Sequence, residues 1–281
     1  MGLDLVLALL ASRPAPRVTV VNRGNSYFGS QDILSAAGVA TVVCDRSDLC
    51  ECASSLLAHN YTWVIDFSAI GPEAPLAVAS ASELLRSVTC GYLLVSTTGV
   101  YVPFMLEARP PFTEAVFKHD SERSWLSRKL VGMNDQLPSM VGKEDAFRKH
   151  SGSLCAVVAR MPLVIGRRDT SARLATLMVM QDAEAAQPGA TSFSQAAHVP
   201  LSWTDSRSAA SALLHLMRAA DAERAAPASY GQRVCGEVFN VAHPQATSLA
   251  ALLGIAANAM GATLRATPSL LPSTPAEWVY A

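Results

Sequence analysis

The sequence is poor in charge and in aromatic side chains. Only 16% of its 281 residues are charged, 6% are aromatic, and the formal net charge is −1. A chain so close to neutral has no long-range field that would attract nucleic acid or an anionic membrane, and we expect neither as a partner. Half of the residues are hydrophobic, which excludes a disordered chain and is enough to build a sizeable core.

Long apolar spans and metal-binding cysteine patterns are also missing. The run LDLVLALLA at residues 3–11 is far too short to cross a bilayer, and it lacks the basic start of a signal peptide. The six cysteines do not have zinc-site spacing, so we expect no metal centre. Because Cys44, Cys90 and Cys155 lie in or beside apolar runs, we expect reduced thiols, a reducing compartment and a cytoplasmic protein.

Short apolar runs alternate with longer amphipathic ones along the chain. The short runs are continuous rather than alternating in polarity, as is typical of parallel strands buried on both faces. This order predicts a doubly wound α/β fold with a parallel sheet. The expected strands are 17–22, 40–45, 62–69, 91–101, 153–166 and 236–242, and the expected helices are 3–11, 30–37, 47–58, 73–87, 139–150, 171–183, 206–220 and 247–260.

The alternation of strand-like and helix-like segments becomes less regular after about residue 166, which predicts two parts. We expect a sheet domain over residues 1–166 and a smaller lobe over residues 167–281, with the strand 236–242 returning to the sheet. In open α/β sheets the ligand crevice lies outside the carboxyl ends of the strands. The candidate site residues are therefore the polar residues that follow each strand.

The first two strands end in charged or amide side chains. Asn22 is neutral and Arg23 carries a guanidinium that suits a phosphate, although an ordinary loop with a solvated arginine is the alternative. Asp45 and Arg46 end the next strand, where the carboxylate either contacts an adenine amino group or caps the following helix. Both pairs are candidates for binding the adenosine half of a dinucleotide.

The later strands end in small residues and hydroxyls. Phe67, Ser68 and Ala69 are candidate cofactor contacts, because the small residues of this stretch would let a cofactor pass close to the backbone. STTGVY (96–101) offers hydroxyls that could orient a substrate alcohol or carbonyl. On the following helix, Lys143 could bind a ribose and lower the pKa of a nearby phenol. Pro162, after the strand that begins at residue 153, is the last expected cofactor contact.

The ordered set VVNRG, DRSDL, VIDFSA, LVSTTGVY, GK…AF, ARMPLVIGRRDTSAR and GEVFNVA resembles the NAD(P)-dependent epimerases and dehydratases of the extended or atypical short-chain dehydrogenase/reductase family. The resemblance covers roughly residues 2–260. It implies a Rossmann-like fold whose first domain binds the dinucleotide, and a small-molecule substrate such as a sugar nucleotide. Asn22-Arg23 in place of an acidic strand end favours NADP over NAD.

The glycine signature of that family is incomplete in this sequence. Its Gly-x-x-Gly-x-x-Gly turn, which binds the cofactor pyrophosphate ahead of the first helix, is matched only at its last glycine, by Gly2. The first strand and the other two glycines would lie upstream of Met1. We therefore expect unpaired strand edges beside the missing strand and reduced stability.

The catalytic set is incomplete as well. The family uses a Tyr four residues before a Lys, and Ser139 stands four residues before Lys143. A serine hydroxyl has too high a pKa to replace the phenol. Thr97 matches the family's catalytic Ser/Thr, so the catalytic set is at best partial. We expect an NAD(P)-binding protein that is weakly active or inactive. The alternatives are an active NADP-dependent reductase or epimerase, and a non-catalytic scaffold or RNA-associated relative.

Overall fold

The structure is a computed structural model that describes residues 1–25, 27–45, 55, 60–67, 90–101, 112–114, 136–150, 154–169, 171, 174–179, 200–226 and 233–259. The chain forms two compact units. The first is Met1–Pro162 with Ser206–Val241, and the second is Leu163–Asp205 with Ala242–Ala281. The helix that begins at Ser206 thus belongs to the first unit, together with the returning strand.

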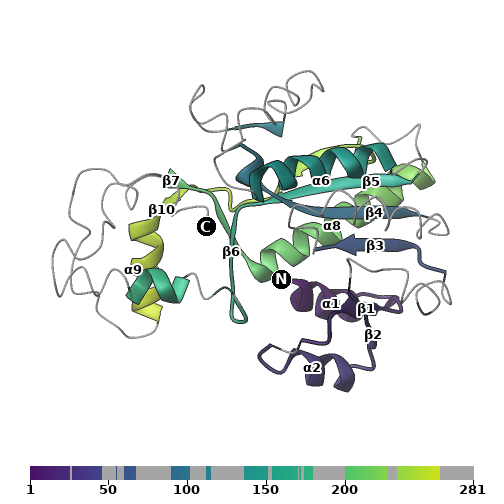
Figure 1. The fold of residues 1–281 in the computed structure, drawn as a ribbon, viewed down its shortest axis with the longest axis horizontal. Coiled ribbons are helices and arrows are strands. Elements are labelled where there is room, and N and C mark those ends of the chain that lie inside the picture. The colour runs from purple at the N-terminus through teal and green to yellow at the C-terminus, as the bar shows by residue number, and fades with distance from the viewer. Residues whose placement is uncertain are drawn as a thin grey trace. The chain divides into compact units, whose positions relative to one another are not determined.

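The first unit contains a parallel sheet of four strands in the order β3-β4-β5-β9. The strands are β3 (Trp63–Asp66), β4 (Gly91–Thr97), β5 (Cys155–Met161) and β9 (Val238–Asn240), and Figure 1 shows the first three side by side. Strand β5 is buried along its whole length, and β4 is buried in all but its last residue. The prediction of a parallel sheet with doubly covered strands is confirmed.

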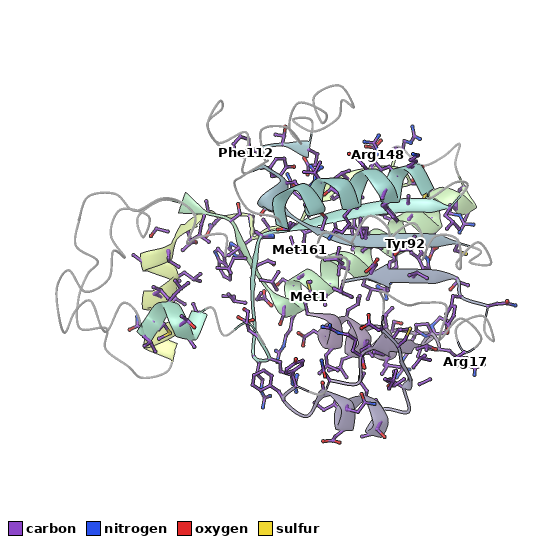
Figure 2. All side chains as sticks on the ribbon, in the orientation of Figure 1. Met1, Arg17, Tyr92, Phe112, Arg148 and Met161 are labelled. Carbon is purple, nitrogen blue, oxygen red and sulfur yellow. A yellow bond between two sulfur atoms is a disulfide. The ribbon has the colours of Figure 1, made fainter. Side chains whose placement is uncertain are left out.

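Helices α6 (Gln136–His150) and α8 (Ser206–Ala225) both contact β4 and β5. Phe147 of α6 packs against Tyr92 of β4, labelled in Figure 2, with ring centroids 4.9 Å apart. Leu94 and Val158 complete this cluster, and they share one face of the sheet with Tyr92. Leu93, one residue earlier in β4, points to the opposite face and is also fully buried.

The N-terminal part of the chain contains two helices and a separate pair of parallel strands. Helix α1 (Gly2–Ala11) packs against α8, β1 (Thr19–Asn22) pairs in parallel with β2 (Ala40–Val43), and α2 (Ser30–Ala36) connects these two strands. Among the described residues, no pairing joins β1 to β3. The β1-β2 pair and the four-stranded sheet are therefore separate in the described part of the chain, and the expected absence of a first strand stays a prediction.

The predicted strand 153–166 is divided at Pro162, which is a correction. Proline has no N–H to donate to a strand ladder, so the pairing of β5 ends before it. After Pro162, β6 (Leu163–Ile165) pairs in parallel with β8 (Trp203–Asp205) in the second unit. The second unit also contains β7 (Pro200–Leu201), antiparallel to β10 (Thr247–Ser248), and helix α9 (Leu249–Ala259).

Other expected elements are found in part. Residues 174–179 of the predicted helix 171–183 are helical, and the predicted helix 206–220 extends to residue 225. The expected helices at 47–58 and 73–87 lie outside the described residues, apart from residue 55. No helix in the described part of the chain is both long and apolar enough to span a membrane.

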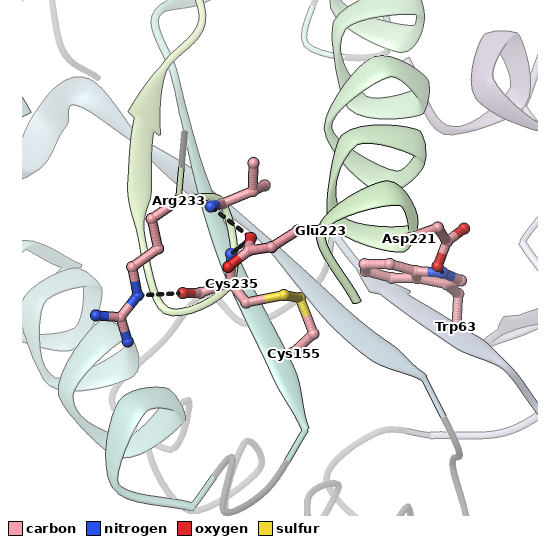
Figure 3. The surroundings of a disulfide bond; sticks show 7 residues. Trp63, Cys155, Asp221, Glu223, Arg233 and Cys235 are labelled. Atoms are coloured by element: carbon pink, nitrogen blue, oxygen red, sulfur yellow. Dashed lines mark hydrogen bonds between the residues drawn. A yellow bond between two sulfur atoms is a disulfide. The ribbon is translucent and has the colours of Figure 1, made fainter. Parts of the chain in front are cut away.

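The expectation of reduced thiols is wrong for three cysteines of the described part of the chain. Cys155, at the start of β5, and Cys235, just before β9, form a disulfide (Figure 3). Cys44 is disulfide-bonded as well, whereas Cys90 is not. Burial in an apolar run suggested an inert thiol, but Cys235 lies 80 residues away in sequence and is brought to Cys155 only by the pairing of β9 with β5.

Gly91 offers a test of the packing between β3 and β4. A β-carbon at Gly91 would lie 2.5 Å from the ring of Trp63, and the indole nitrogen of Trp63 donates a hydrogen bond to Asp221. Gly91→Ala should therefore lower the free energy of unfolding by about 1–3 kcal/mol through overpacking. Gly254→Ala is the control, because nothing lies within 4 Å of its added carbon on α9. Urea denaturation of both variants measures the effect, and equal stabilities would contradict this account.

Candidate functional site

The carboxyl end of β4 carries the hydroxyls that the sequence singled out. The strand ends at Thr97, and a short 3₁₀ turn over residues 98–101 follows. The Thr97 hydroxyl accepts a hydrogen bond from the Gly99 N–H at 3.1 Å and is half-buried. Thr97 therefore lies at the strand end, where a ligand crevice is expected, and its oxygen helps to shape the turn.

Helix α6 runs antiparallel to the strands, as its contacts show. Glu144 is level with Ser96, near the carboxyl end of β4, whereas Phe147 is level with Tyr92, near the start of that strand. The N-terminal turns of α6 therefore extend toward the carboxyl edge of the sheet. Ser139 lies in α6, one turn before Lys143.

The side chain of Lys143 is buried between α6, to which it belongs, and β4, and it is not exposed in a crevice. Its side chain is 2% exposed, and its ammonium group donates a hydrogen bond to the Val95 carbonyl at 3.1 Å. Val95 lies two residues before the end of β4, so the ammonium group is engaged inside the strand layer. The predicted contact between Lys143 and a cofactor ribose stays a prediction.

A buried ion pair joins α6 to β5. Arg160 donates from Nη2 to Glu144 Oε2 at 2.7 Å and from Nε to Glu144 Oε1 at 3.1 Å, and both side chains are 1% exposed. The Ser96 hydroxyl donates to the same carboxylate at 2.5 Å. This bidentate pair supplies the charge compensation that a buried guanidinium requires.

The same guanidinium reaches the turn after β4 and the end of β9. Arg160 Nη1 donates to the Tyr101 hydroxyl at 2.7 Å, and that hydroxyl donates to Asn240 Oδ1 at 2.8 Å. The Asn240 N–H donates to Glu114 at 2.8 Å, and Phe112 stacks on Tyr101 with centroids 5.6 Å apart. We call Ser96, Tyr101, Glu144, Arg160 and Asn240 the Arg160 network.

Burial and neighbouring charges shift the pKa of two groups in the Arg160 network. Burial raises the pKa of the Tyr101 phenol above its usual value, although the neighbouring Arg160 acts in the opposite direction. Burial by itself lowers the pKa of Arg160, but the hydrogen bonds and charge of Glu144 outweigh it and raise that pKa. Tyr101 is therefore a neutral hydroxyl and Arg160 a permanent cation at neutral pH.

The ends of β1 and β2 lie next to each other, which brings the predicted adenosine contacts into one region. The Cys44 N–H donates to the Asn22 carbonyl at 2.8 Å, and the side-chain oxygen of Asn22 accepts from the Gly24 N–H at 2.8 Å. Arg23 and Asp45 are exposed beside them. Arg46, which belongs to the same predicted set, lies outside the described residues.

Gly2 and Phe67 are also brought together. A β-carbon at Gly2 would lie 3.9 Å from the ring of Phe67, which directly follows β3. The start of α1 is thus adjacent to the carboxyl end of β3, and the predicted role of Gly2 in cofactor binding stays a prediction. Ser68 and Ala69 lie outside the described residues, and Pro162 is half-buried at the end of β5.

Sequence reasoning missed the Arg160 network. Arg160 is the single charged residue in the strand CAVVARM, and a charge inside a continuous apolar strand is a signal of a buried partner. The partner itself, Glu144, could not be identified without the placement of α6. Within the described residues, no group of three or more His, Cys, Asp or Glu side chains is arranged to hold a metal ion.

No protein-family model matches the sequence, and no curated protein matches it. The structure is similar to that of UDP-glucuronic acid 4-epimerase from Bacillus cereus, solved with UDP-glucuronic acid and NAD, with a TM-score of 0.65, 14% identity, and 98% of this chain and 83% of that chain covered. It is also similar to dTDP-glucose 4,6-dehydratase from Bacillus anthracis in complex with NAD, with a TM-score of 0.66 and 12% identity, and 97% of this chain and 81% of that chain are covered. A third similar structure is the enzyme WbmG from Bordetella bronchiseptica in complex with NAD and UDP, with a TM-score of 0.60 and 15% identity, and 97% of this chain and 78% of that chain are covered.

The buried ion pair predicts a graded loss of stability. Glu144→Gln leaves the Arg160 charge buried without its counter-charge and should cost about 3–5 kcal/mol of unfolding free energy. Ser96→Ala removes one hydrogen bond to the carboxylate and should cost about 1.5–3 kcal/mol. Denaturant titration followed by circular dichroism ranks the two variants, and a Ser96→Ala variant as unstable as Glu144→Gln would refute this order.

Proposed function

We propose that this chain is a dinucleotide-binding relative of the NAD(P)-dependent epimerases and dehydratases of the short-chain dehydrogenase/reductase family, with weak or no catalytic activity of its own. The small-molecule partner that fits this proposal is a sugar nucleotide. The observation that carries the proposal is the state of α6, in which Lys143 is buried against β4 and the sequence contains no tyrosine.

The strand ends support a dinucleotide site. The fold is shared with enzymes solved in complex with NAD, and ligands of open α/β sheets bind outside the carboxyl ends of the strands. At that edge the chain presents Gly2 beside Phe67, and Arg23 and Asp45 beside Asn22. A pyrophosphate next to the first turn of α1 would also benefit from the N-terminal helix dipole.

The end of β1 supports NADP rather than NAD. An acidic side chain at this position would accept hydrogen bonds from the ribose hydroxyls of NAD. Asn22 is neutral and its side-chain oxygen accepts the Gly24 N–H, so the ribose hydroxyls would find an amide here and no carboxylate. The exposed Arg23 guanidinium can instead pair with a 2′-phosphate.

The geometry around α6 supports weak catalysis. An acid/base group must reach the reacting atoms beyond the strand ends, but Lys143 is engaged with Val95 inside the strand layer. Tyr101 does not replace the missing phenol, because its hydroxyl is held by Arg160 and Asn240 and burial raises its pKa.

Helical geometry suggests a second register for the missing catalytic pair. Positions 140 and 136 lie one and two turns before Glu144 on the same face of α6, closer to the carboxyl edge of the sheet. They are four residues apart, which is the spacing of the family's Tyr and Lys. Gln136 and Met140 occupy them, so this register lacks both the tyrosine and the lysine, whereas the first lacks only the tyrosine.

The cofactor preference can be tested by calorimetric titration. NADPH should bind more tightly than NADH, and Arg23→Ala should weaken NADPH binding about ten- to hundredfold by removing a charge-assisted contact. Binding of NADH should not change. Arg17→Ala is the matched control, since Arg17 is also exposed but lies before the opposite end of β1. NADH binding as tight as NADPH binding would contradict the preference.

Activity can be tested with UDP-glucose, UDP-glucuronic acid and dTDP-glucose in the presence of NADP⁺ or NADPH. Loss of a general acid/base removes a factor of roughly 10²–10⁴, so we expect turnover well below about 1 s⁻¹. Thr97→Ala should lower any residual rate further. Turnover in the ordinary enzyme range would overturn the proposal.

Rescue variants distinguish the two registers. A gain of activity in Ser139→Tyr would place the acid/base one turn before Lys143. A gain only in the double variant Gln136→Tyr with Met140→Lys would place it at the earlier positions. Melting temperatures of both variants control for misfolding.

A further inference from the structure

The turn before β9 is bound to the rest of the first unit by one covalent and several non-covalent contacts. The disulfide joins Cys235 to Cys155, and the Glu223 carboxylate accepts the N–H groups of Val234 and Cys235 at 2.7 and 2.9 Å (Figure 3). The Gly236 N–H donates to the Ala156 carbonyl at 2.6 Å. These contacts start the pairing of β9 with β5.

The other end of β9 lies in the Arg160 network. Asn240 is the last residue of the strand, and its side chain accepts the hydrogen bond of Tyr101. Asn240 lies only five positions after Cys235, so the two are at most about 17 Å apart. The disulfide and the candidate site therefore hold opposite ends of one short segment.

We propose that the Cys155–Cys235 disulfide is a redox latch that keeps β9, and with it Asn240, in place at the carboxyl edge of the sheet. In the oxidised protein β9 is held at both ends. In the reduced protein its first end keeps non-covalent contacts, among them those of Glu223, Gly236 and Glu237, and the strand detaches far more often. The functional part of this inference, a lower affinity for the dinucleotide, rests on the proposed function.

The pairing of β9 with β5 is short, so the position of β9 depends on the Cys155–Cys235 disulfide. In the described part of the chain β9 pairs only with β5, through Val158, Ala159 and Arg160. Three residue pairs at a sheet edge bury little surface and open readily. A cross-link between residues 80 positions apart removes much of the freedom that opening would regain.

Packing beside the turn is incomplete, which favours movement there. A hollow of about 220 Å³, partly open to solvent, is lined by Gly236 and Val238 of the returning segment, by Ala156 and Val158 of β5, and by Phe147 of α6. Side chains around such a hollow have fewer neighbours that oppose a shift of the turn. The turn can therefore shift into the hollow once the covalent bond is broken.

The redox step requires a dithiol reductant. Its thiolate attacks Sγ of Cys235, which is half-buried, whereas Cys155 is buried. Cys155 leaves as a thiolate and takes up a proton, and the second thiol of the reductant then attacks the mixed disulfide and releases Cys235. The protein gains two electrons and two protons, and the reductant becomes a disulfide.

Hydrogen exchange of the full chain tests the latch without any cofactor. In Cys235→Ser, the amides of residues 238–240 should exchange at least about tenfold faster, while those of β4 keep their protection. Cys90→Ser is the control, because Cys90 is a cysteine outside the disulfides and should leave β9 unchanged. Wild type treated with a dithiol is compared in parallel, since reduction would also open the disulfide of Cys44.

The outcomes separate the latch from the proposed function. Equal exchange of β9 in wild type, Cys235→Ser and reduced protein overturns the latch. Uniformly faster exchange over β4, β5 and β9 also overturns it, because the disulfide would then stabilise the fold as a whole. If β9 is released but no variant binds NADPH, the latch stands and the proposed function fails. If Cys235→Ser does not fold, reduced wild type supplies the same comparison.

Discussion

The buried ion pair between Arg160 and Glu144 is the interaction on which the first unit depends. Burying two charges is costly unless geometry and further hydrogen bonds compensate, and here Ser96 and Tyr101 provide them. Each of these partners comes from a different element, so satisfying one guanidinium fixes the relative positions of β4, β5 and α6. Asn240 extends the same constraint to β9 through the Tyr101 hydroxyl.

This constraint also limits the chemistry that the strand ends can perform. With Glu144 directed at Arg160, the adjacent Lys143 is turned into the strand layer and donates to Val95. Tyr101 likewise contributes its hydroxyl to the network instead of to a ligand. The polar groups nearest the expected crevice therefore stabilise the fold, and a reacting group would have to come from the earlier turns of α6 or from Thr97.

The sheet could be predicted from the sequence, whereas its polar interior could not. Continuous apolar runs specify buried parallel strands, and the break at Pro162 could have been read from its missing N–H. The pairing of Arg160 with Glu144, and of Cys155 with Cys235, depends on which segments meet in the fold, and no local pattern encodes that. That the residues at the ends of β1 and β2 lie close together could be predicted, because the pairing of neighbouring parallel strands alone places their carboxyl ends side by side.

The two constraints on β9 differ in kind, and this difference decides how the candidate site responds to its surroundings. The contact of Asn240 with Tyr101 is non-covalent and adjusts continuously with temperature and ligand binding. The bond between Cys155 and Cys235 is covalent and changes only with the redox state. Because β9 has three paired residues, neither constraint is redundant. The order of the strand-end network is thus tied to the thiol chemistry at the far end of the same strand.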